Sequence, residues 1–295
     1  MRALPAFLLA AVLMTACGTA KTPPRPPSAA AVQVVVTVGW GAQELARGPG
    51  PPAKVATTTR AVTPIETTYG GRYVSSLGGR QGDGAREWIF WVNGIEAAVG
   101  AADIAVAPGD VVWWDLHRWA GRTHVPAVIA SWPMPLAGDL RSNGGAVTAD
   151  PPLATALTAS GLAVSAPAGT AGPRAIVGAS TVLVDRDATW RAAVADPAAA
   201  GLTAWIDGSG VVRVWDADHA AAIVVSSATA VIVATTEGFS AEGAPVFVVA
   251  GTTAKAAAQA ASLLVADPGL VRNHAAICLD ATGRIVCSGG RGRTP

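Results

Sequence analysis

Apolar and polar positions begin to alternate at residue 32. The stretch VQVVVTVGW puts every second residue from Val32 to Trp40 on one side of an extended chain, with Gln33 and Thr37 on the other. Because successive side chains of a strand point to opposite faces, this pattern predicts a strand. Residues 41–64 are rich in Gly, Pro and Thr and show no period, which predicts a loop with one short helix or strand near AKVATTT.

Five of the ten tryptophans of the chain fall within residues 88–119, although the chain has only four Phe and two Tyr. The segments EWIFWVNG and VVWWDLHRW are rich in strand-forming residues. Asn93-Gly94 is a strong hairpin signal, because both residues tolerate positive φ. Pro108-Gly109 suits a type II turn. The pattern predicts a small β module, with RYVSSLGG as a further strand.

Alternation in the last strand of this module separates two faces. Val112, Trp114 and Leu116 form an apolar face that we expect to lie in the core. We expect the opposite face to be accessible, since flat aromatic surface with a few polar groups is typical of binding sites. If the two tryptophan-rich strands are neighbours, the candidate ligand-binding residues are Trp91, Asn93, Trp113, Asp115, His117 and Trp119.

Plain packing is the alternative for each of these rings. We assign Trp40, Trp88 and Trp114 to the core, whereas the pattern does not decide between core and binding roles for Trp113 and Trp119. Asp115 and His117 suit a local salt bridge better than a ligand pair. His124 adds a second imidazole, but two histidines and one carboxylate make a weak metal site.

Residues 137–295 show a different pattern, in which predicted strands alternate with predicted helices. SWPMPL marks the junction, GAVTAD, LAVSAP and APVFVVAG read as strands, and GLTAWIDGSGVVRVWD reads as a hairpin. PPLATALTASG, DATWRAAVAD and TTAKAAAQAASLLVAD read as helices, the last with Thr252 or Thr253 as its N-cap. This order predicts an α/β layer with a partly parallel sheet.

The first residues resemble a bacterial lipoprotein signal. Residues 1–16 combine Arg2 with an apolar run that is too short to span a bilayer, and the small-residue pattern MTAC places Cys17 where lipidation requires it. An ordinary secretory signal with an incidental cysteine is the alternative. Residues 17–31 include KTPPRPPSAAA, whose prolines predict a semi-rigid tether. We therefore expect a lipid-anchored protein on the extracytoplasmic face of the cell membrane.

Charge and cysteine content indicate which partners and which covalent links to expect. The formal net charge is +1 and no basic patch stands out, so nucleic acid is not an expected partner. Cys278 and Cys287 flank LDATGRIV, which reads as two short strands around a turn and would place the sulfurs opposite each other. Export permits a disulfide here, and two buried thiols are the alternative.

The segment WIFWVNGIEAAVGAADIAVAPGDVVWWDL resembles the DUF4430 family, which is related to the C-terminal β domain of transcobalamin and intrinsic factor. Val92-Asn93-Gly94 and Gly109-Asp110 carry the likeness, which covers roughly residues 32–119. The resemblance implies a compact β-grasp-like sheet, and in the vitamin carriers this domain caps cobalamin. The C-terminal segments SWPMPL, RAIVGAS, GLTAWI and PVFVVAGTTAKAAAQAASLL resemble the corresponding part of DUF4430 lipoproteins.

The expected fold is thus α+β, with a β-grasp-like domain over residues 32–136 and an α/β domain over residues 137–295. The first functional hypothesis is a non-enzymatic lipoprotein that binds a small planar ligand, such as cobalamin or another corrinoid, and presents it to an importer. The alternative is a protein–protein or cell-envelope interaction module without a small ligand. An exported hydrolase has the least support, because no nucleophile and base pair stands out. Asp216, Asp218 and His219 read as a solvated turn rather than a metal site, and no cofactor is expected.

Overall fold

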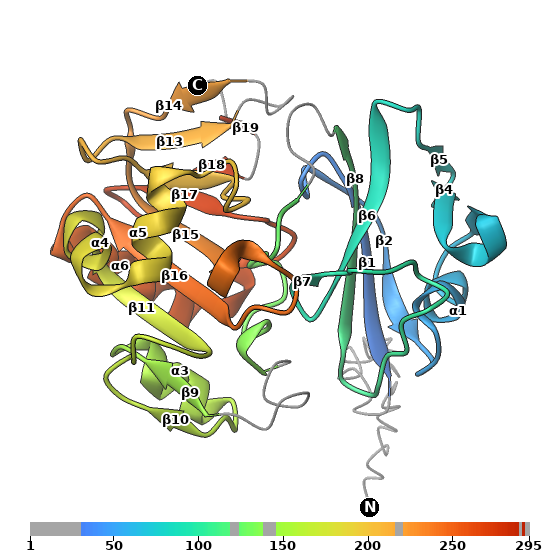
Figure 1. Ribbon diagram of the computed structural model, residues 1–295, viewed down its shortest axis with the longest axis horizontal. Helices are drawn as coiled ribbons and strands as arrows, with labels where there is room; N and C mark the ends of the chain where they lie inside the picture. Colours follow the sequence, from blue (N-terminus) through green and yellow to red (C-terminus); the bar gives the residue numbers. More distant parts are fainter. Residues whose placement is uncertain (1–30, 119–123, 138–145, 216–220, 289–290, 293–295) are drawn as a thin grey trace, which may run out of the picture.

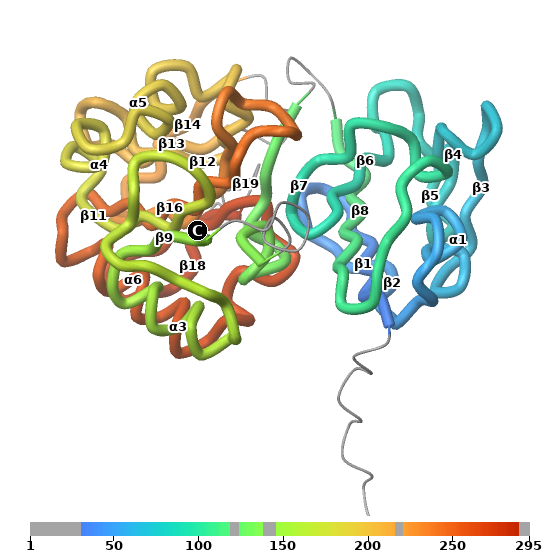
Figure 2. Tube along the Cα trace, turned by 60° about the horizontal axis from the view of Figure 1, so that its bottom comes forward, coloured from blue at the N-terminus to red at the C-terminus, as the bar shows by residue number. Residues whose placement is uncertain are grey.

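Two sheets lie side by side in the computed structural model, which describes residues 31–118, 124–137, 146–215, 221–288 and 291–292. The N-terminal sheet lies on the right in Figure 1 and the C-terminal sheet on the left. The segment 124–137 runs between them, as the green tube in Figure 2 shows.

The N-terminal sheet has five strands in the order β2-β1-β8-β6-β7. Its strands are β1 (Val32–Val38), β2 (Gln43–Gly50), β6 (Arg86–Val92), β7 (Ile95–Glu96) and β8 (Val111–Arg118). β1 pairs antiparallel with β2 and parallel with β8, and helix α1 (Val55–Arg60) follows β2 and packs on one face. β1 and β2 thus form a hairpin, α1 packs on the sheet, and the last strand β8 lies beside the first strand β1. This arrangement confirms the expected small β-grasp-like sheet.

A second layer covers the same face of this sheet as α1. It consists of β3 (Ile65–Thr68), the 3-10 turn η1 (Tyr69–Gly71), β4 (Tyr73–Leu77) and β5 (Arg80–Gln81). Leu77 packs with Trp88 and Trp114 in the core between the layers. The apolar face of β8 therefore lies inward, as the alternation predicted.

The first strand ends earlier than the sequence pattern suggested. β1 stops at Val38, and Gly39 and Trp40 both have positive φ, at 68° and 62°. This turn carries the Trp40 ring to the other side of the sheet from Val34, where it joins Val35. The expectation that Trp40 shares a face with Val34 is wrong, because the strand period does not continue through a turn. Strand β2, within the predicted loop 41–64, was not expected either.

The C-terminal sheet has eight strands in the order β10-β9-β11-β16-β15-β17-β18-β19. Its first four members, which pair in parallel, are β10 (Val164–Ser165), β9 (Val147–Ala149), β11 (Arg174–Ala179) and β16 (Pro245–Gly251). The antiparallel members are β15 (Ala228–Thr236), β17 (Ile277–Asp280), β18 (Ile285–Ser288) and β19 (Arg291–Gly292). This confirms the expected partly parallel α/β layer.

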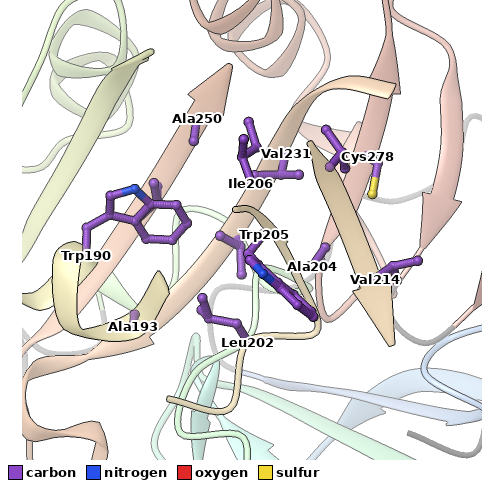
Figure 3. Close-up of a cluster of buried hydrophobic side chains, with 14 of the residues drawn as sticks. Trp190, Ala193, Leu202, Ala204, Trp205, Ile206, Val214, Val231, Ala250 and Cys278 are labelled. Atoms are coloured by element: carbon purple, nitrogen blue, oxygen red, sulfur yellow. The ribbon is translucent and has the colours of Figure 1, made fainter. Parts of the chain in front are cut away.

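Both faces of the C-terminal sheet are covered. Helices α3 (Leu153–Ala159) and α6 (Ala254–Ala266) pack on one face, and Thr253 caps α6 by accepting a hydrogen bond from Ala256 N at 3.2 Å. The other face carries α4 (Ser180–Arg186), α5 (Ala188–Ala195) and the small sheet of β12 (Ala204–Ile206), β13 (Val212–Trp215) and β14 (Ala222–Val224). Figure 3 shows how Trp190 of α5 and Trp205 of β12 fill this second core.

Two details compare directly with the sequence pattern. Cys278 on β17 lies opposite Cys287 on β18, and the two form the expected disulfide. Strand β15, which pairs with both β16 and β17, was not predicted, although every residue in it except Thr229 is buried.

Two 3-10 turns, η2 (Glu237–Phe239) and η3 (Pro268–Val271), follow β15 and α6, respectively. Over the described ranges, no helix combines the length and apolar character that a membrane span requires.

Candidate functional site

Strand register brings the predicted site residues together. β6 and β8 pair antiparallel, with Trp91 opposite Trp113, Ile89 opposite Asp115 and Glu87 opposite His117. The Trp91 and Trp113 rings lie 4.8 Å apart between centroids. The two tryptophan-rich strands are therefore neighbours, as the sequence analysis supposed.

The expectation that this face is accessible is wrong. Trp91 and Asp115 are 0% exposed, Trp113 is 1% exposed and His117 is 3% exposed. Val128 of the connecting segment and Ala275 of the C-terminal half pack against the two indoles. The face is closed by the other half of the same chain, because alternation tells which side chains share a face but not what covers them.

The connecting segment is itself buried on both sides. Val125 and Val128 pack on the N-terminal sheet, whereas Ala127 and Ile129 join the C-terminal core. Its backbone is bound in both directions: Val128 N donates to Gly94 O at 2.9 Å, and Ile129 N donates to Ala275 O at 3.3 Å. The segment thus behaves as a shared layer between the sheets rather than as a free linker.

Asp115 is held as a structural carboxylate. It accepts hydrogen bonds from Thr37 Oγ1 at 2.6 Å, from Trp40 N at 2.8 Å and from Gly41 N at 2.9 Å. Its Oδ1 also lies 3.0 Å from His117 Nδ1, and the Trp40 ring stacks on the His117 ring at 3.7 Å. Asp115 and His117 are thus paired with each other within the fold, which is the reading that the sequence favoured over a ligand pair.

Asn93 shapes the hairpin between β6 and β7. Its φ is 53°, its Nδ2 donates to Asp110 Oδ1 at 3.0 Å, and its Oδ1 accepts from Val111 N at 2.9 Å. Both ends of the amide are thus used to join two turns. Trp119, Cys17 and the Asp216, Asp218 and His219 group lie outside the described residues.

A cleft of about 520 Å³ opens where the two halves meet, next to the closed aromatic face. It is bounded by β1 and β2, the start of β8, the segment Ala130–Trp132, and Arg272 and Asn273 after η3. Its volume falls within the range of roughly 300 to 1,000 Å³ that small-molecule sites occupy. Of the predicted site residues that the structure describes, Trp113 is the one that lines this cleft.

Two buried polar groups in the cleft wall lack hydrogen-bond partners within the described part of the chain. They are the indole Nε1 of Trp113 and the hydroxyl of Ser131. Ser131 is 8% exposed and Trp113 is 1% exposed. Because an unsatisfied buried donor costs about 1–3 kcal/mol, such groups need an explanation, and a ligand is one.

Charged groups lie at the mouth of the cleft. Arg47 Nη2 donates to Asn273 Oδ1 at 2.5 Å and to Glu44 Oε2 at 2.8 Å, which joins β2 to the C-terminal half. The hydrogen bond from Arg47 lowers the pKa of Glu44. Arg272 is exposed, and its guanidinium makes no hydrogen bond or ion pair within the described ranges.

Sequence reasoning missed Ser131, Arg47 and Arg272 because each stands outside any motif. SWPMPL, which contains Ser131, was noted only as a junction, although a tryptophan next to a domain junction is a usable signal for an interdomain site. Within the described residues, no group of three or more His, Cys, Asp or Glu side chains could hold a metal ion.

Comparison with protein families supports the resemblance of the N-terminal part. Residues 53–118 match the model of DUF4430, a domain of unknown function. The matched region runs from the approach to α1 through the end of β8, and so includes both tryptophan-rich strands. No curated protein matches the chain.

Proposed function

We propose that the protein is a non-enzymatic, lipid-anchored binding protein on the extracytoplasmic face of the cell membrane, and that it holds a small ligand in the cleft between its two sheets. The observation that carries this proposal is the pair of unpartnered polar groups, Trp113 Nε1 and Ser131 Oγ, in the wall of a 520 Å³ cleft. The cleft adjoins the predicted recognition face and has Trp113 in common with it.

The proposed location follows from the N-terminal pattern. A signal that ends at Cys17, followed by a proline-rich tether, suits a protein held near a membrane but free to present a site. At about 3.1 Å per residue, such a tether lifts the folded part clear of the lipid headgroups. Delivery of a nutrient to an importer is the activity we propose for this arrangement.

Cobalamin and its precursor cobinamide are the first ligands to test, because the family resemblance points to a domain that caps cobalamin. A corrinoid is large for this cleft and would project from it, so binding of a smaller planar molecule is the broader proposal. Equilibrium dialysis against cobinamide, cobalamin and smaller planar compounds measures retention directly.

A blocking variant tests the location of the site. Ser131→Trp places a bulky ring in the cleft wall, and we expect it to abolish retention of any ligand that the wild type binds. Ser226→Trp is the matched control, because Ser226 is exposed on a turn away from the cleft. Retention by Ser131→Trp equal to that of the wild type would place binding elsewhere.

A second candidate function is an interaction module of the cell envelope. It is favoured by the exposed side chains Tyr69 (84%) of η1 and Tyr73 (38%) of β4, and by Val99 (53%), which follows β7 and lines a shallow pocket together with Tyr73. A photo-crosslinking residue at position 69 would capture a partner in intact cells, whereas the same residue at Arg60 provides the control. Crosslinks at both positions alike would argue against a specific surface.

A further inference from the structure

We infer that the cleft takes a planar organic acid, with its carboxylate bound by Arg272 and its flat body against the half-buried indole of Trp132. This inference rests on the proposed function, since it names the class of ligand for the same cleft. Hydrogen-bond chemistry, charge and shape lead to it independently.

Hydrogen-bond chemistry is the first argument. The indole N–H of Trp113 and the guanidinium of Arg272 can only donate, and the Ser131 hydroxyl can donate or accept. None of the three has a hydrogen-bond partner among the described residues. A ligand that satisfies them must therefore present acceptor oxygens, and a carboxylate presents two without bringing a donor of its own.

Charge is the second argument. The ionised groups that line the cleft are Arg47, Arg272 and Asp110. The carboxylate of Asp110 already has partners within the chain, because it accepts hydrogen bonds from Asn93 Nδ2 at 3.0 Å and from Ala107 N at 2.7 Å. Glu44, just outside the lining, is paired with Arg47, and the charge of Arg272 also lowers the pKa of Glu44. The guanidinium of Arg272 makes no hydrogen bond or ion pair within the described ranges, and its planar fork matches a carboxylate.

Shape is the third argument. Trp113 packs against Trp91 with centroids 4.8 Å apart, and Trp132 packs against Phe247 at 4.4 Å. Both indoles are thus held in place by a neighbouring ring, and Trp132 is the half-buried one. Val35 and Ala130 add apolar side chains to the lining. A rigid flat ring in the wall favours a planar body over a branched or flexible one.

Calorimetric titration of the full-length protein with three matched probes tests the inference. The probes are 2-naphthoate, the neutral 2-naphthamide and the cationic 2-naphthylmethylamine, which share one flat ring system. We expect the acid to bind at least about tenfold more tightly than the amide, and the amine to bind most weakly. Arg272→Ala should weaken binding of the acid far more than binding of the amide, so that the preference for the acid disappears.

Controls separate this inference from the proposed function. Arg60→Ala removes an exposed arginine of α1 that does not line the cleft and should leave all affinities unchanged. Equal affinity for acid and amide, or a preference for the acid that survives Arg272→Ala, would overturn the inference while binding in the cleft stands. Failure of all three probes at millimolar concentration would also overturn it, and retention of cobinamide in dialysis would then show that the proposed function still holds.

Discussion

Nδ1 of His124 lies 2.7 Å from Oε2 of Glu96, at the junction of the two sheets. Nε2 of the same ring lies 2.7 Å from the carbonyl oxygen of Phe239 in η2. A carbonyl oxygen only accepts hydrogen bonds, so His124 donates to Phe239 through Nε2. One imidazole therefore joins β7 of the N-terminal sheet to the C-terminal half.

Removing the carboxylate should weaken this junction. Glu96→Ala deprives both His124 and the Val125 amide, which donates to Glu96 at 2.8 Å, of their acceptor. We expect the free energy of unfolding to fall by about 2 kcal/mol, since two partly buried donors lose a partner. Glu96→Gln keeps an acceptor oxygen and should cost less. Urea unfolding at pH 7 compares the two, and equal losses would contradict a hydrogen-bonding role.

The same carboxylate gives the stability a pH dependence. Burial raises the pKa of Glu96 above its ordinary value of 4.5, although the neighbouring His124, the Val125 amide and His117 oppose this shift. The folded state therefore binds this proton more tightly than the unfolded state. The stability that Glu96 contributes is present in full below pH 4.5 and is lost as the pH rises through the raised pKa.

Glu96→Gln does not titrate, so the stability that it loses relative to the wild type should become smaller as the pH rises from 4.5 to 7. Urea unfolding of both proteins at several pH values in this window measures this change. In a His124→Gln background a group that lowers the pKa of Glu96 is absent, so the change with pH should be larger. A difference between wild type and variant that does not change with pH would contradict the shift.

We expect Asp115 to stabilise the fold rather than to bind a ligand. Asp115→Asn replaces one acceptor oxygen with an NH₂ group, which faces either the donors Thr37 and Gly41 at the Oδ2 position or the donor Trp40 N at the Oδ1 position. We expect a loss of about 3 kcal/mol in the free energy of unfolding. Asp103→Asn, at an exposed ion pair with Arg72, should change it by less than about 1 kcal/mol.

Ligand affinity decides between the two roles of Asp115. The folded fraction of Asp115→Asn should bind cleft ligands as the wild type does, because Asp115 does not line the cleft. Loss of ligand binding with no loss of stability would restore the recognition role that the sequence pattern suggested for this face.

Local patterns predicted much of the fold because they act within single elements. Asn93-Gly94, the alternation over β8 and the Thr253 cap each depend on residues only a few positions apart. The disulfide could be predicted for the same reason, since Cys278 and Cys287 flank one tight hairpin. Strand β15 carries an almost unbroken run of small and β-branched residues, which gives no alternating signal when both faces are covered.

The candidate site was harder to predict because it depends on contacts between distant segments. Trp113 and Asp115 were placed on one face correctly, but Val128 and Ala275, which close that face, come from beyond the module. The cleft needs Ser131 and Arg272 beside Trp113. A local sequence pattern does not show which loops of two sheets come into contact. The sequence could therefore indicate Trp113 as a candidate but not the residues that surround it.

The contact between Gly41 and Asn273 supports one side of the cleft and allows a matched test. Gly41 has a φ of 82°, and a Cβ added there would lie 1.4 Å from the carbonyl oxygen of Asn273. Gly79 has a similar φ of 76° with nothing within 4 Å of an added Cβ. Gly79→Ala should therefore cost about 1 kcal/mol from backbone conformation alone.

Gly41→Ala should cost clearly more than Gly79→Ala, because the new methyl group pushes Asn273 away from β2. That displacement also separates Asn273 from Arg47 and widens the mouth of the cleft, so affinity for a cleft ligand should fall as well. Thermal unfolding and equilibrium dialysis of both variants measure the two effects. Equal destabilisation by the two substitutions would show that the halves do not approach as closely at Gly41, and unchanged affinity in Gly41→Ala would show that this contact does not shape the binding site.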